Sequence, residues 1–153
     1  MDLTTVEDTL NIQQLYARYS DAIMRNDAGT FGSCWSDDGY WLLLGNEYRG
    51  KEAIVEAYSN SVKGTDFILH LAMSPLISID GDKAKVRSQV QEILHFSGGG
   101  AMMILANYND ELQKVDGQWL FAARRISVRY SGPFHMDDNT FMPLPPDADK
   151  PFV

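Results

Sequence analysis

Among the side chains of this sequence, a histidine within an apolar segment is best suited to proton-transfer chemistry. His70 lies on the face of a predicted strand that it shares with Ile68 and Ala72. The pKa of an imidazole lies near neutral pH, so the ring can accept and return a proton under physiological conditions. The alternative is a core histidine that only bonds to the backbone.

A tyrosine on a predicted helix is the second candidate. Tyr19 belongs to an apolar stripe at helical spacing with Ile12, Leu15, Tyr16 and Ile23. A phenol that points into an enclosed space can donate a hydrogen bond to a substrate oxygen and stabilise developing negative charge. The alternative is a core tyrosine whose hydroxyl bonds elsewhere in the fold.

Metal and cofactor chemistry has no comparable signal. The three histidines, His70, His95 and His135, have no ligand spacing of the kind that zinc sites show. No glycine-rich phosphate loop follows a predicted strand, and Gly98–Gly100 is interpreted as a hairpin turn. We therefore predict no metal and no cofactor.

The elements that position these candidates begin with helices. The apolar stripe predicts a first helix through residue 23, with Thr4 or Thr5 capping its start. A short second helix is expected at about 30–35, followed by a turn at 36–39, and a third helix begins at residues 50–52 and stops at Gly64.

Strands dominate the rest of the chain. Period-two patterns and turn residues predict strands at 40–44, 47–49, 67–73, 75–80, 84–96, 101–114 and 119–130. Helices followed by consecutive antiparallel strands indicate an α+β fold. We expect a cone-shaped α+β barrel in which a curved, mostly antiparallel sheet and about three N-terminal helices enclose a pocket.

The last part of the chain is different in composition. Residues 131–153 contain all but one of the six prolines together with several large apolar side chains. We predict one domain over residues 1–130 and a C-terminal extension over 131–153 that packs on the body or on a neighbouring subunit.

The order and spacing of four segments resemble the SnoaL-like branch of the nuclear transport factor 2 superfamily. This branch includes scytalone dehydratase, hexachlorocyclohexane dehydrochlorinase and a bile-acid dehydratase. The resemblance covers about residues 8–135. It is carried by Leu15–Ala22 with Trp35–Trp41, by Gly50–Ile54, by His70 with Ile77–Ala84, and by Tyr108–Leu112 with Val115–Arg125.

The resemblance implies a role for His70 and raises a question about its partner. In the dehydratases of this branch, a histidine at this place is the general base, and an acidic residue five positions after a helix tyrosine orients it. Tyr19 matches the tyrosine, but Met24 occupies the acidic position. A thioether cannot stabilise an imidazolium as a carboxylate does. Asp21 is the alternative carboxylate on this helix.

Other site residues follow from the same resemblance. Tyr19 matches a tyrosine that donates to substrate oxygen, and His95 is placed like a second pocket histidine. Arg129 resembles an arginine near the pocket mouth that stabilises an oxyanion or a carboxylate. The alternatives are a solvent-facing histidine and a surface arginine. The substrate-binding candidates are Met24, Asp21, Trp41, Tyr40, Tyr108 and Asn107.

The charge and the composition restrict the partners. A net charge of −8 argues against nucleic acid and anionic membranes, which attract basic patches. The single cysteine, Cys34, excludes an intrachain disulfide, and no apolar run is long enough for a membrane span. We expect a cytoplasmic protein that binds a small organic ligand and forms a homodimer or homotrimer.

Three functions compete at this point. The first is a cofactor-independent lyase or isomerase, dehydratase-like, that acts on a small apolar or aromatic molecule through His70. The second is a non-catalytic module that binds a small ligand, which Met24 favours. The third is a non-catalytic β-type subunit of an aromatic-ring dioxygenase, because residues 121–127 resemble the last strand of such subunits.

Overall fold

The computed structural model describes residues 2–137 and 141–142. Three helices precede or interrupt the sheet, and they are α1 (Leu3–Met24), α2 (Ala28–Ser33) and α3 (Lys51–Ser61). The described residues also form seven strands, namely β1 (Trp35–Leu43), β2 (Asn46–Arg49), β3 (Thr65–Ala72), β4 (Leu76–Asp80), β5 (Lys83–Phe96), β6 (Ala101–Val115) and β7 (Gln118–Phe134).

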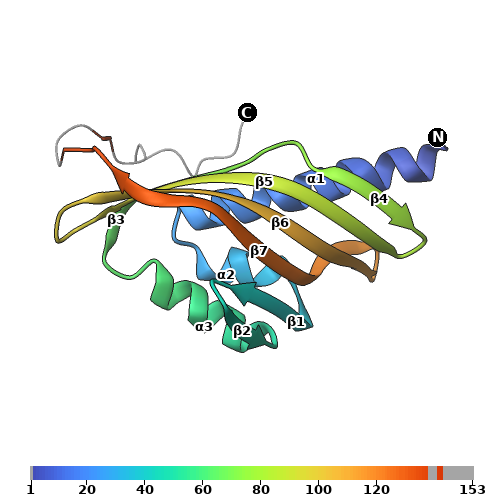
Figure 1. Ribbon diagram of the computed structural model, residues 1–153. Coiled ribbons are helices and arrows are strands. Elements are labelled where there is room, and N and C mark those ends of the chain that lie inside the picture. The colour runs from blue at the N-terminus through green and yellow to red at the C-terminus, as the bar shows by residue number, and fades with distance from the viewer. Residues whose placement is uncertain (1, 138–140, 143–153) are drawn as a thin grey trace.

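The sheet is mixed and open. Its strand order is β2-β1-β7-β6-β5-β3, and β4 pairs with β5 beside β3. Among the described strand pairs, β1 and β7 run parallel and the others are antiparallel. The long strands β5, β6 and β7 curve across the molecule, with α1 along one face (Figure 1). The expected α+β cone is confirmed, and no pairing closes the sheet between β2 and β3 within the described residues.

Helix α1 buries the predicted apolar stripe against the sheet. Ile12, Leu15, Tyr16 and Tyr19 are all buried. The capping prediction was wrong by a few residues. Asp2 is the N-cap and accepts a hydrogen bond of 2.7 Å from the backbone N–H of Thr5, because a carboxylate satisfies a free amide at a helix start.

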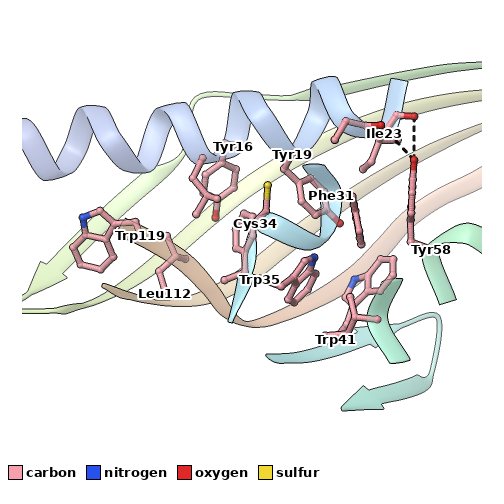
Figure 2. Close-up of a cluster of buried hydrophobic side chains, with 14 of the residues drawn as sticks. Tyr16, Tyr19, Ile23, Phe31, Cys34, Trp35, Trp41, Tyr58, Leu112 and Trp119 are labelled. Atoms are coloured by element: carbon pink, nitrogen blue, oxygen red, sulfur yellow. Dashed lines mark hydrogen bonds between the residues drawn. The ribbon is translucent and has the colours of Figure 1, made fainter. Parts of the chain in front are cut away.

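An aromatic cluster holds α1, α2 and α3 against the sheet (Figure 2). The rings of Phe31 and Tyr58 stack with centroids 4.1 Å apart, which joins α2 to α3. The Tyr58 hydroxyl donates to the carbonyl of Ala22 at 3.3 Å, which joins α3 to the end of α1. Trp35 lies fully buried beside Tyr19 in the same cluster.

The expected turn at 36–39 is instead part of β1. The pairing of β1 with β7 shifts register between Trp35 and Tyr40, so the polar residues form an irregular strand segment. A Cβ at Gly39 would be crowded, because it would lie 3.1 Å from Trp35 and 3.2 Å from Ile54. The Gly39 carbonyl accepts the N–H of Gly50, which has φ 85° and begins α3.

The sequence pattern placed the end of the last strand too early. β7 continues to Phe134, so residues 131–134 pair with β6 rather than belonging to an irregular extension. Further along, the ring of Phe141 packs on Phe67 with centroids 5.3 Å apart. The rest of the predicted extension, residues 138–140 and 143–153, lies outside the described residues.

Candidate active site

A cavity of about 220 Å³ lies between the helices and the inner face of the sheet. Most of its lining is apolar or aromatic, which is the usual character of a small-molecule site. The lining residues are Tyr19, Ile23, Trp41, Leu43, Leu44, Tyr58, Ser61, Val62, His70, Glu92, Leu94, Phe96, Met102, Ile104, Tyr108 and Ile126. A more open depression of about 340 Å³ elsewhere on the molecule is lined largely by polar side chains such as Arg87 and Glu111, so the enclosed cavity is the better candidate.

His70 is a buried polar group of this cavity. It lies on β3 and is 4% exposed, with Nδ1 2.9 Å from the Oγ of Ser20 on α1. Burial, together with the nearby positive charge of Arg124, lowers the pKa of the His70 ring to about 3. The imidazole is therefore neutral at physiological pH.

Tyr19 lies next to His70 in the wall of the cavity. The two ring centroids are 5.8 Å apart, and Tyr19 is 1% exposed. Burial raises the pKa of Tyr19 well above its ordinary value, so the phenol keeps its proton. Among the residues that the structure describes, no group accepts a hydrogen bond from the Tyr19 hydroxyl. A buried donor without a partner is costly, and a ligand oxygen in the cavity would satisfy it.

Glu92 is a cavity residue that the sequence analysis missed. It is on β5, directly opposite His70 in the antiparallel pairing of β3 with β5. Its signal was present in the sequence. Val86, Ser88, Val90 and Leu94 belong to the buried face of β5, and Glu92 continues their alternation as a half-buried acidic residue. Burial raises the pKa of the Glu92 carboxyl to about 7.

The sequence analysis also missed Arg124, which contacts two tyrosines of the cavity wall. It is 1% exposed, and its guanidinium lies 4.3 Å from the ring centre of Tyr19 and 3.9 Å from that of Tyr108. Its Nε donates to Asp110 at 3.0 Å, and the hydroxyl of Tyr16 donates to the same carboxylate. This buried pair holds Tyr19 and Tyr108 in place through cation–π contacts.

Four of the ten predicted site residues line the cavity, namely Tyr19, Trp41, His70 and Tyr108. Tyr40 and Asn107, the sequence neighbours of Trp41 and Tyr108, do not line the cavity. Tyr40 donates its hydroxyl to Glu47 at 3.1 Å, away from Trp41, and Asn107 is not among the lining residues. The reason is the period of a strand, because adjacent side chains point to opposite faces.

His95 lies on the face of β5 opposite the cavity. At this end of the strand the even-numbered residues line the cavity, so the odd-numbered His95 points to the other face. It is buried, its ring packs on that of Phe141 with centroids 4.8 Å apart, and its Nδ1 lies 2.5 Å from Oδ1 of Asp66. The structure therefore does not bring His95 together with His70.

Three further candidates lie elsewhere. Asp21 is exposed and pairs with Arg25 at 2.9 Å, and Met24 lines a separate surface depression with Asp66. Both face away from the stripe that carries Tyr19, because each residue turns an α-helix by about 100°. Arg129 is exposed on the last part of β7 and is not a lining residue.

Within the described ranges, no three side chains of the metal-binding types come together in a potential site. None of the helices there combines the length and the apolar character of a membrane span.

Residues 4–125 match the family model of the SnoaL-like domain. The chain belongs to the SnoaL-like family. This match includes α1, β3 and β5, which carry Tyr19, His70 and Glu92.

Individual relatives of this SnoaL-like chain agree with the assignment. Gamma-hexachlorocyclohexane dehydrochlorinase from Sphingobium indicum is 25% identical over 142 residues, which cover 86% of this chain and 87% of the relative. A candidate scytalone dehydratase from Novosphingobium aromaticivorans superposes with a TM-score of 0.82 at 20% identity, and the match covers 90% of this chain and 94% of that one. At this identity, the structural similarity shows that the two proteins share a fold.

A third relative has a solved structure and no known function. It is the Rv3472(D26N) protein of Mycobacterium tuberculosis, which is 31% identical with a TM-score of 0.75. The match covers 82% of this SnoaL-like chain and 73% of that one.

Proposed function

We propose that this protein is a cofactor-independent lyase or isomerase that acts on a small apolar or aromatic molecule, with His70 as the proton acceptor. The observation that carries the proposal is the placement of a neutral imidazole and a partnerless phenol side by side in one apolar cavity. The relative named gamma-hexachlorocyclohexane dehydrochlorinase supports a lyase-type reaction.

The hydrogen bond with Ser20 prepares His70 for this role. When Nδ1 donates to the Ser20 Oγ, the other ring nitrogen carries the lone pair that takes up a proton. A substrate with a carbonyl group would place its oxygen on the Tyr19 hydroxyl, and the carbon next to that carbonyl would give its proton to His70. The phenol then stabilises the enolate that forms.

Ser20 is the hydrogen-bond partner of His70 on α1. Replacing Ser20 with Ala removes the group that fixes the tautomer of His70, and one hydrogen bond of this kind contributes about 1 kcal/mol. We expect kcat for proton transfer to fall about fivefold while KM changes little, because the cavity wall is kept. Steady-state kinetics of Ser20→Ala beside the wild type would measure this split. An unchanged kcat would show that Ser20 does not orient the base.

Exchange of substrate protons with solvent is the experiment that tests the proposed function. Indanone is a small aromatic ketone with exchangeable protons next to its carbonyl, and it needs no leaving group. In deuterated buffer, the wild-type protein should speed deuterium uptake at that carbon, as followed by NMR. Saturable binding of indanone without any increase in exchange would favour the binding-module alternative and contradict the proposal.

A further inference from the structure

A second proton-carrying group shares the cavity with His70. Glu92 and His70 are direct partners in the pairing of β5 with β3, so their side chains leave the sheet on the same face with Cβ atoms about 5 Å apart. Both line the cavity. Tyr19, Tyr58 and Tyr108 line it too, and the charge of Glu92 acts on all three phenols.

The Glu92 carboxyl has no structural role of the usual kind. It makes no hydrogen bond and no ion pair with any residue in the described part of the chain. Burial is the one cause of its raised pKa, so no cation offsets the cost of ionising it. A carboxyl kept in an apolar cavity without a partner destabilises the fold when it is charged, and such groups are concentrated at functional sites.

The chemistry of His70 calls for such a group. Burial and Arg124 disfavour the imidazolium that forms when His70 takes a proton. The family's usual carboxylate position is Met24, which lies away from the cavity, and Asp21 is exposed. Of the Asp and Glu side chains in the described ranges, Glu92 alone lines the cavity.

We propose that Glu92 is a second catalytic residue, a general acid that protonates a departing hydroxyl group, so that the reaction is the loss of water from a small apolar molecule. This inference rests on the proposed function of His70. It concerns substrates that carry a hydroxyl group on the carbon β to an activating carbonyl, and it assigns to Glu92 the proton that the departing hydroxyl needs.

The elimination of water is balanced in protons and electrons. His70 takes the proton from the carbon next to the carbonyl, and the electrons of that C–H bond form the new C=C bond. The bond from the β carbon to the hydroxyl oxygen breaks, and the Glu92 carboxyl gives its proton to that oxygen, which leaves as water. An imidazolium and a carboxylate then face each other, and transfer of the proton from His70 to Glu92 restores the starting state.

The leaving group decides whether an acid is needed. Hydroxide is a strong base and departs readily only when it is protonated, whereas chloride is a very weak base and departs without a proton. Dehydration therefore depends on both Glu92 and His70, and elimination of chloride depends on His70 alone.

A pair of matched substrates tests this dependence. A β-hydroxy indanone and its β-chloro counterpart would be followed by the absorbance of the common indenone product, after subtraction of the spontaneous rate. We expect Glu92→Gln to lower the rate of water loss at least about a hundredfold and to leave the rate of chloride loss within about threefold. Glu56→Gln, on the exposed face of α3, is the control and should leave both rates unchanged.

The outcomes separate the two proposals. Equal water loss in Glu92→Gln and wild type, with deuterium uptake into indanone still catalysed, would overturn the role of Glu92 and keep that of His70. A loss of deuterium uptake in Glu92→Gln as great as the loss of dehydration would also overturn it, because uptake needs no acid for a leaving group.

A titration without substrate tests the inference independently. In protein with isotope-labelled glutamate, the carboxyl resonance that is missing from Glu92→Gln should titrate with a midpoint near 7. A midpoint near the ordinary value for glutamate would overturn the proposal, because Glu92 would then be an anion at neutral pH with no proton to give.

Discussion

His70→Ala lowers the rate of proton removal from a ketone by about 10²–10⁴-fold, since a positioned general base contributes a factor of this size. The reason is specific to the position. His70 is the histidine of the cavity, while His95 lies on the opposite face of β5 against Phe141. Deuterium uptake into indanone, measured for the variant and the wild type at equal protein concentration, gives the ratio directly.

Two control variants accompany this measurement. His70→Gln keeps much of the volume of the side chain and a hydrogen bond with Ser20 but removes the basic nitrogen, so it should lose as much activity as the alanine variant. Arg129→Ala alters an exposed residue outside the cavity and should retain the wild-type rate. Wild-type rates of deuterium uptake in both His70 variants would show that His70 is not the base.

Asp110→Ala is expected to cost about 3–5 kcal/mol of unfolding free energy, because it leaves a buried guanidinium without its carboxylate. Asp110 accepts two hydrogen bonds from Arg124, both at 3.0 Å, and one from the hydroxyl of Tyr16. Both charged residues are almost fully buried. The midpoint and slope of urea denaturation, read by far-ultraviolet circular dichroism, measure the change.

The neighbouring pair on the same two strands provides the matched control. Glu111 and Arg125 are also 3.0 Å apart, but their side chains are 55% and 41% exposed. An exposed pair contributes about 0–1 kcal/mol, so Glu111→Ala should change stability by no more than that. Equal losses in Asp110→Ala and Glu111→Ala would show that burial does not set the importance of the Arg124 pair.

The helices and strands could be predicted from the sequence because the periodicity of their apolar residues is clear. The stripe of Ile12, Leu15 and Tyr19 repeats at helical spacing, and β5 alternates between buried and exposed residues for most of its length. The turn predicted at 36–39 failed because Asp, Asp and Gly also occur in a strand with a register shift. Local composition does not distinguish these two cases, since the pairing with β7 decides between them.

The site was only partly readable, because a strand pattern does not tell which face is enclosed. His95 was a predicted site residue, but the cavity is lined by the other face of β5, with Glu92 and Leu94. The ring of His95 packs on Phe141, which lies far along the chain. Ser20 follows Tyr19 directly, and its contact with His70 depends on how α1 is rotated over β3.

The central claim is that His70 is a neutral base that faces a ligand in the cavity, and NMR of its ring nitrogens tests this most directly. The folded protein should show the signals of one neutral tautomer, protonated at Nδ1, from neutral pH down to about pH 4, because the pKa of His70 is lowered to about 3. Addition of indanone should shift these signals in a saturable way. A charged imidazolium at pH 6, or ring signals that indanone leaves unchanged while it binds elsewhere on the protein, would contradict the account.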